Sequence, residues 1–321
     1  MQPQRFASYT LLRHLATGGM GELYLARRDG VAGFSKQVVV KRLRDDLALD
    51  EEFVEMFLDE GRLAAMLDHA NIVHVYELGE ANNSYFMAME YVHGIDLGSL
   101  LGAVDGALDL TAALYIMRNI CEGLAFAHDA AGMDGQPMHL VHRDINPQNI
   151  LISEAGAVKI TDFGIAKVAQ RQHQTQAGIL KGKFGYLSPE QARGQPVDRR
   201  CDIYALGLLL FEMTTGQSAV SSGTEAQMLE GAAHGMLRQP EEFVPTYPRA
   251  LGNIFRRCTS YRPGDRFQNV PDLLDELVEF QMDARILATP KALVKLVSRH
   301  FGETFDAQRR ALTPARSTPP A

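Results

Sequence analysis

The first ninety residues alternate short apolar runs with turns rich in glycine and charged residues. Runs of this length and pattern are typical of β-strands. They predict strands at residues 9–16, 22–28, 36–43, 72–80 and 84–92. Between the third and fourth strands, residues 50–69 instead carry apolar side chains near helical spacing after an acidic first turn, and they predict a helix.

Beyond Gly94 the apolar positions acquire helical spacing. They predict helices at about residues 111–130, 198–215, 224–234, 247–259, 270–284 and 290–302. The last of these begins at a proline, a residue that is favoured at the first helical position. The pattern therefore predicts an α+β protein, with a small β-sheet lobe that carries one helix and a larger, mainly α-helical lobe.

Composition narrows the possible partners. The chain has 321 residues, 46% of them hydrophobic and 22% charged, which suits one large or two modest domains. A net charge of −7 and the lack of a Lys/Arg-rich run argue against nucleic acid as a partner. No stretch approaches the ~18 apolar residues of a membrane helix, so no membrane segment is expected. Three distant cysteines without CxxC spacing favour a reducing compartment, and we expect a cytoplasmic protein.

Three separated polar clusters are candidates for chemistry, although each has a plain structural explanation when taken alone. Gly18, Gly19 and Gly21 lie in a turn between two predicted strands, where backbone N–H groups could approach an anion or simply form a hairpin. The second cluster is HRDINPQN, residues 142–149, between two apolar runs. The third is TDFG, residues 161–164, at the end of a predicted strand.

Together these clusters supply what phosphoryl transfer from a nucleoside triphosphate requires. The reaction needs a loop over the phosphates, a cation on them, carboxylate and amide oxygens for Mg²⁺, and a base near the incoming hydroxyl. Lys41, at the end of VVVK, could be the cation, and Glu60 on the following helix could pair with it. An exposed Lys–Glu pair alone would mean little.

The order and spacing of these motifs resemble those of a protein kinase, in particular the eukaryotic-like Ser/Thr kinases of bacteria. The resemblance implies the bilobal protein-kinase fold over residues 9–282, divided into an N-lobe (9–90), a hinge (91–95) and a C-lobe (96–282). Outside it we expect an N-terminal extension (1–8), a C-terminal helical extension (283–303) and a flexible tail (304–321).

The resemblance implies an ATP site between the lobes. Lys41 matches the strand lysine that holds the α- and β-phosphates, and Glu60 matches the helix glutamate that orients it. Met89 falls at the gatekeeper position, followed by hinge positions whose backbone binds adenine. The positions assigned to the nucleotide are Ala16, Gly18, Gly19, Gly21, Leu23, Val39, Lys41, Met89, Glu90, Val92, Asp96 at the ribose, Leu151 beneath adenine, and Asp162.

The resemblance also assigns catalytic roles. Asp144 matches the aspartate that accepts the proton of the substrate hydroxyl. Asn149 and Asp162 match the two magnesium ligands, so ATP and Mg²⁺ are the expected cofactors. Glu190 is expected to pair with Arg266 in a structural role, and Asp202 is expected to anchor the backbone of the catalytic loop, residues 142–149.

Some positions depart from the family pattern. Ala16 replaces the first glycine of the phosphate loop, and Val39 replaces a smaller alanine above adenine. Asn146 replaces the lysine that usually contacts the γ-phosphate, and Lys183 replaces a threonine of the substrate-binding loop. We hypothesise that both take part in catalysis, the positive charge having moved from position 146 to Lys183. The alternative is that Lys183 points to solvent and Asn146 only weakens catalysis.

The expected function is transfer of the γ-phosphoryl group of ATP to Ser or Thr of protein substrates in bacterial signalling. Arg143 precedes Asp144, a pair typical of kinases whose arginine binds a phosphorylated activation-loop residue, and Thr175 is the candidate for that autophosphorylation. Two alternatives stay open. A pseudokinase is opposed by retention of Lys41, Asp144, Asn149 and Asp162. A small-molecule phosphotransferase is opposed by the SPE segment at residues 188–190.

Overall fold

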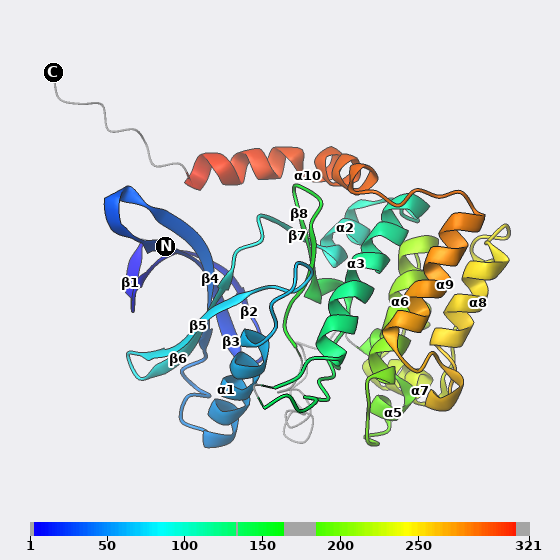
Figure 1. Ribbon diagram of the computed structural model, residues 1–321, viewed down its shortest axis with the longest axis horizontal. Helices are drawn as coiled ribbons and strands as arrows, with labels where there is room; N and C mark the ends of the chain where they lie inside the picture. Colours follow the sequence, from blue (N-terminus) through cyan, green and yellow to red (C-terminus); the bar gives the residue numbers. More distant parts are fainter. Residues whose placement is uncertain (1–2, 133, 164–183, 313–321) are drawn as a thin grey trace.

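The structure is a computed structural model that describes residues 3–132, 134–163 and 184–312 (Figure 1). It has two lobes: an antiparallel sheet with one helix comes first in the chain, and a larger, mainly helical lobe follows. This arrangement confirms the predicted bilobal α+β fold. The Val73 N–H donates to the Ile160 carbonyl at 2.9 Å, which is one of the contacts between the lobes.

The small lobe is built on a six-stranded antiparallel sheet in the order β1-β2-β3-β4-β6-β5. Its strands are β1 (Gln4–Phe6), β2 (Tyr9–Thr17), β3 (Gly21–Asp29), β4 (Ser35–Leu43), β5 (Val75–Ala81) and β6 (Ser84–Glu90). Five of them lie at predicted strands. The short strand β1 falls within residues 1–8, and Phe6 is buried there against the ring of Phe86, so this extension is part of the sheet.

Helix α1 (Glu51–Ala65) packs against β5 and β6. Asp50 caps it by accepting a hydrogen bond from the Glu52 N–H, and Phe57 is fully buried. At Gly61 a Cβ atom would lie 2.7 Å from the Leu78 Cδ1, so glycine allows the helix to approach the sheet this closely. The approach brings the neighbouring Glu60 toward β4.

A second, three-stranded sheet joins the lobes. It pairs β7 (Gly94–Asp96), β8 (Ile150–Ser153) and β9 (Val158–Ile160). At Gly94 a Cβ atom would lie only 2.0 Å from the Ile152 carbonyl oxygen, so the hinge backbone lies directly on β8. The hinge is therefore fixed to the strand that follows the catalytic loop.

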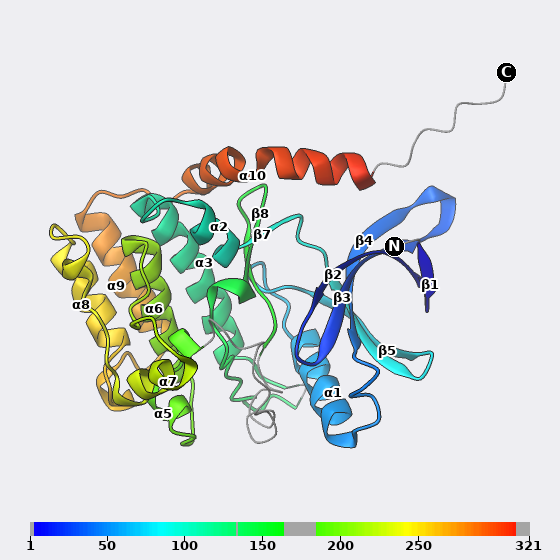
Figure 2. The same cartoon turned by 180° about the vertical axis from the view of Figure 1, so that it is seen from behind.

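The larger lobe surrounds α6, whose side chains are buried along nearly its whole length. The bounds of its helices are α2 (Leu97–Ala103), α3 (Leu110–His128), α5 (Pro189–Ala192), α6 (Arg200–Thr215), α7 (Glu225–His234), α8 (Arg249–Cys258), α9 (Val270–Asp283) and α10 (Pro290–Leu312). Helix α10 contacts α2 and α3, and Figures 1 and 2 show it running along one side of the molecule past β7 and β8.

One boundary differs from the sequence prediction. We expected the last helix to end near residue 303 and a flexible tail to begin at residue 304, but α10 continues to Leu312. The reason is an apolar stripe at four-residue spacing: Leu293, Val297 and Phe305 are fully buried, and Phe301 packs against the core between them. Residues 313–321 lie outside the described part of the chain. Over the described ranges, no helix is long and apolar enough to cross a membrane.

Candidate active site

Lys41, Glu60 and Asp162 meet where the two lobes join. Lys41 comes from β4, Glu60 from α1, and Asp162 lies just after β9. The Lys41 Nζ donates a hydrogen bond to the Glu60 Oε1 at 2.5 Å and another to the Asp162 Oδ1 at 2.9 Å. Three distant segments thus place a cation between two carboxylates, and the Lys41–Glu60 pair is the one that the resemblance implied.

The charge of Lys41 is fixed by these neighbours. Its side chain is only 12% exposed, and burial alone would lower the pKa of Lys41. The carboxylates of Asp162 and Glu60 outweigh burial and raise the pKa of Lys41 well above its usual value. Lys41 is therefore a permanent cation at this site, suited to phosphate oxygens.

Asp202, from α6, anchors the catalytic loop. Its carboxylate accepts hydrogen bonds from the backbone N–H of His142 at 2.8 Å and of Arg143 at 2.7 Å. Arg143 has φ +66°, a left-handed conformation that is costly for a side chain of this size and needs such support. The His128 Nε2 lies 2.8 Å from the same carboxylate. Burial would raise the pKa of Asp202, but the hydrogen bond and charge of His128 lower it.

Asp144 and Asn149 are joined within that loop. The Asn149 Nδ2 donates to the Asp144 carbonyl at 2.8 Å and to the Asp144 Oδ2 at 2.5 Å. Because the amide nitrogen is used in this way, the Asn149 Oδ1 is the atom suited to face a metal ion. The Thr161 N–H donates to the Asn149 carbonyl at 3.0 Å, which brings Asp162 beside Asn149.

These residues fit a magnesium–nucleotide complex. Mg²⁺ is usually held by one or two protein ligands together with substrate phosphates and water, and the amide oxygen of Asn149 and the carboxylate of Asp162 are ligands of this kind. Over the described residues, no group of three or more His, Cys, Asp or Glu forms a self-contained metal cage.

The Asn146 side chain makes hydrogen bonds within the catalytic loop. It is 1% exposed, its Nδ2 donates to the Asp144 carbonyl at 2.9 Å, and its Oδ1 accepts from the Gln148 N–H at 3.0 Å. It thereby caps the short 3-10 turn Pro147–Asn149. Lys183, to which we assigned the displaced charge, lies outside the described residues, as does Thr175.

The apolar side chains that we expected around adenine lie together. The side chains of Leu23, Val39, Met89, Val92 and Leu151 belong to one apolar cluster. Ala16 is the cross-strand partner of Leu23 at the end of the phosphate loop. Asp96, expected at the ribose, caps α2 by accepting hydrogen bonds from the Ser99 N–H at 2.8 Å and hydroxyl at 2.6 Å. The Glu90 side chain points to β9, where its Oε2 lies 2.9 Å from the Lys159 Nζ.

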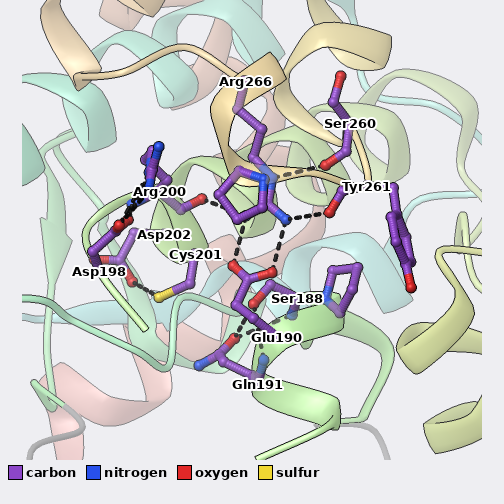
Figure 3. A network of polar contacts seen from close by, with 12 residues as sticks. Ser188, Glu190, Gln191, Asp198, Arg200, Cys201, Asp202, Ser260, Tyr261 and Arg266 are labelled. Carbon is purple, nitrogen blue, oxygen red and sulfur yellow. Dashed lines mark hydrogen bonds and ion pairs between the residues drawn. The ribbon is translucent and has the colours of Figure 1, made fainter. Parts of the chain in front are cut away.

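Glu190 and Arg266 form the expected ion pair, shown in Figure 3. Two parallel hydrogen bonds of 2.7 and 2.8 Å join them, and the Arg266 side chain is fully buried. Arg266 also donates to the carbonyls of Ser260, Arg200 and Tyr261. Burial would raise the pKa of Glu190, but the hydrogen bonds and charge of Arg266 lower it.

Two positioning residues were not predicted from the sequence. The Gln191 Nε2 donates to the Arg143 carbonyl at 2.9 Å. This bond links the catalytic loop to the residue that follows the activation segment (residues 162–190). His128 supports Asp202 from the end of α3. Neither residue stands in a local pattern that signals chemistry, because both act on partners far away in the chain.

Comparisons with known proteins agree with this geometry. Residues 9–293 match the family described as protein kinase domain. The chain is 40% identical over 309 residues to the tyrosine-protein kinase MasK of Myxococcus xanthus, an alignment that covers 95% of this chain and 48% of that protein. It is 37% identical over 265 residues to the serine/threonine-protein kinase PrkC of Bacillus subtilis, covering 83% of this chain and 39% of that protein.

Two further relatives complete the comparison. The serine/threonine-protein kinase PknB of Mycobacterium leprae is 41% identical over 281 residues, covering 84% of this chain and 42% of that protein. The crystal structure of the Mycobacterium tuberculosis PknI kinase domain has a TM-score of 0.64 and 28% identity, covering 87% of this chain and 98% of that chain. The chain thus spans less than half the length of the curated relatives it matches.

Proposed function

The chain belongs to the protein kinase family, and we propose that it transfers the γ-phosphoryl group of ATP to serine or threonine hydroxyls of proteins. The observation that carries this proposal is the contact of Lys41 with both Glu60 and Asp162, beside a catalytic loop that holds Asp144 and Asn149. A pseudokinase would be expected to have lost one of these groups. All five are present.

Each group has a defined task in the proposed reaction. Lys41 binds the α- and β-phosphates, and Glu60 holds Lys41 in place. Asp144 accepts the proton of the substrate hydroxyl. At the same time the hydroxyl oxygen bonds to the γ-phosphorus, and ADP leaves. Asn149 and Asp162 would hold Mg²⁺, which neutralises phosphate charge when it is bound. The nucleotide positions named at the hinge and phosphate loop would enclose the adenine and ribose.

The displaced charge is also part of the proposal. Asn146 carries no charge, so position 146 supplies no cation to the γ-phosphate. Its amide is committed to hydrogen bonds within the loop. We propose that Asn146 positions Asp144 and that Lys183 supplies the missing charge. We further propose autophosphorylation at Thr175 and, because the reaction consumes ATP and all three cysteines are free and buried, a cytoplasmic site of action.

Tyrosine is a second candidate acceptor, because the relative with 40% identity is named a tyrosine-protein kinase. The deciding experiment is incubation with labelled ATP and Mg²⁺ and a generic protein substrate, followed by phosphoamino-acid analysis of the substrate and of the chain itself. Phosphoserine or phosphothreonine is expected, with none formed by the Asp162→Ala variant. Phosphotyrosine alone would support the second candidate, and nucleotide binding without transfer would show a pseudokinase.

A further inference from the structure

The end of α10 lies against the hinge. The Phe305 side chain is fully buried, and its ring centroid is 5.5 Å from that of His93. His93 stands between Val92 and Gly94, in the short segment that connects the lobes. The His93 ring also contacts the Tyr91 ring, with the two centroids 6.1 Å apart. A hinge side chain is therefore packed between the hinge itself and the C-terminal helix.

A carboxylate on the β8–β9 turn connects the same two elements. The Glu154 N–H donates to the His93 carbonyl at 3.0 Å, and the Glu154 Oε2 lies 3.3 Å from the His93 Nδ1. Arg309, one helical turn beyond Phe305, binds that carboxylate and also contacts Asp306. Glu154 thus contacts both the hinge, through His93, and α10, through Arg309.

Helix α10 is itself anchored in the larger lobe. Leu293 and Val297 are fully buried in the main core. At Gly156, φ is +84° and a Cβ atom would lie 2.8 Å from the Val294 Cγ2, so the β8–β9 turn fits closely against the first turns of the helix. These contacts would hold α10 without its last turns, so the packing of Phe305 and Arg309 adds a separate connection to the hinge.

We propose that α10 is a hinge clamp, in which Phe305 and Arg309 are positioning residues that hold His93 and Glu154 and so fix the hinge backbone that receives the nucleotide. This inference rests on the proposed function. A hinge that is held in its binding conformation loses less entropy on binding, and affinity rises accordingly. The clamp acts from the face of the hinge that carries His93, while the Glu90–Lys159 ion pair holds the segment at its other end.

The inference predicts a nucleotide defect that is separate from a stability defect. In the full chain, Phe305→Ala and Arg309→Ala should weaken ADP binding in calorimetry, about 5–10-fold for Phe305→Ala and less for the partly exposed Arg309. The KM for ATP should rise in parallel, while kcat at saturating ATP stays within about twofold. Arg310→Ala, an exposed arginine one position further along, is the matched control and should change neither.

Hydrogen exchange separates this inference from the proposed function. Peptides containing the Glu154 N–H should exchange faster in Phe305→Ala than in wild type or Arg310→Ala, and the conservative Phe305→Leu should restore most of the protection. If wild type binds no nucleotide, the proposed function fails, while exchange still reports whether α10 holds the hinge. Unchanged exchange at Glu154, or a lower melting temperature with unchanged ADP affinity, would overturn the clamp.

Discussion

Glu190 and Arg266 form a buried, doubly hydrogen-bonded ion pair that fastens the end of the activation segment to the turn before α9. Removing one partner of such a pair leaves the other charge buried and unpaired. Glu190→Gln and Arg266→Met should each destabilise the protein by about 3–5 kcal/mol, measured by urea unfolding. The double variant should lose less than the sum of the two, and strict additivity would show that the pair is not coupled.

The same pair predicts a dependence on pH. The pKa of Glu190 is lowered in the folded protein, so its contribution is present above its ordinary pKa of 4.5 and is lost as pH falls through the lower folded value. Unfolding measured between pH 7 and pH 3 should show this loss in wild type. In Glu190→Gln the corresponding part of the acid dependence should be missing, and an identical acid profile would contradict the assignment.

Glu212, on α6, predicts the opposite slope. Burial raises its pKa to about 7, so the folded state binds more protons than the unfolded state between pH 4.5 and 7. Stability should therefore fall as pH rises through this interval and level off above it. Glu212→Gln should remove the slope and stabilise the protein at pH 8 by about 1–3 kcal/mol. The exposed Glu230→Gln serves as control, and equal effects of the two changes would argue against a raised pKa.

Lys41→Met should abolish phosphoryl transfer while the protein stays folded. In the proposed reaction Lys41 neutralises charge that develops on the phosphates, and losing such a stabiliser costs on the order of 10²-fold or more in rate. Circular dichroism and transfer of labelled phosphate measure the two effects. Lys36→Met, an exposed lysine on the same strand, is the control. Near-full activity in Lys41→Met would mean that the nucleotide lies elsewhere.

The displaced charge predicts a recovery in a mutant cycle. Lys183→Thr should lose most activity, and adding Asn146→Lys should restore much of it by returning a cation to the catalytic loop. Asn146→Lys alone should be slower than wild type, because Asn146 caps the Pro147–Asn149 turn and bonds to Asp144. Initial rates at saturating ATP measure all four proteins. Wild-type rates from Lys183→Thr would contradict the proposal that Lys183 supplies the missing charge.

Activation by Thr175 is tested after incubation with ATP. The Arg143 Nε is buried and has no hydrogen-bond partner among the described residues, as expected for an arginine that awaits a phosphate. Thr175→Ala should then fail to gain the activity that preincubation gives wild type. Mass spectrometry identifies the modified residue. Equal activation of the two proteins would show that activation does not depend on Thr175.

The sequence by itself determined the order of the elements and identified the residues on which the proposed chemistry depends. Strand and helix periodicity depend on near neighbours, so the sheet lobe, the helical lobe and the seam between them could be predicted. The candidate catalytic groups could be named as well, because the family's chemistry requires fixed residue types at fixed spacing within short motifs. In the structure, Lys41 contacts both Glu60 and Asp162, and Asn149 donates a hydrogen bond to Asp144.

Only the tertiary structure decided how those groups are held. That Asn146 turns inward depends on hydrogen bonds within a folded loop, and the support of Arg143 by Gln191 joins residues 48 positions apart. The length of α10 was predicted wrongly, because whether Phe305 stabilises a longer helix depends on the residues that it packs against. Its partner is His93, more than two hundred residues earlier in the chain, and a pattern read along the sequence carries no record of that contact.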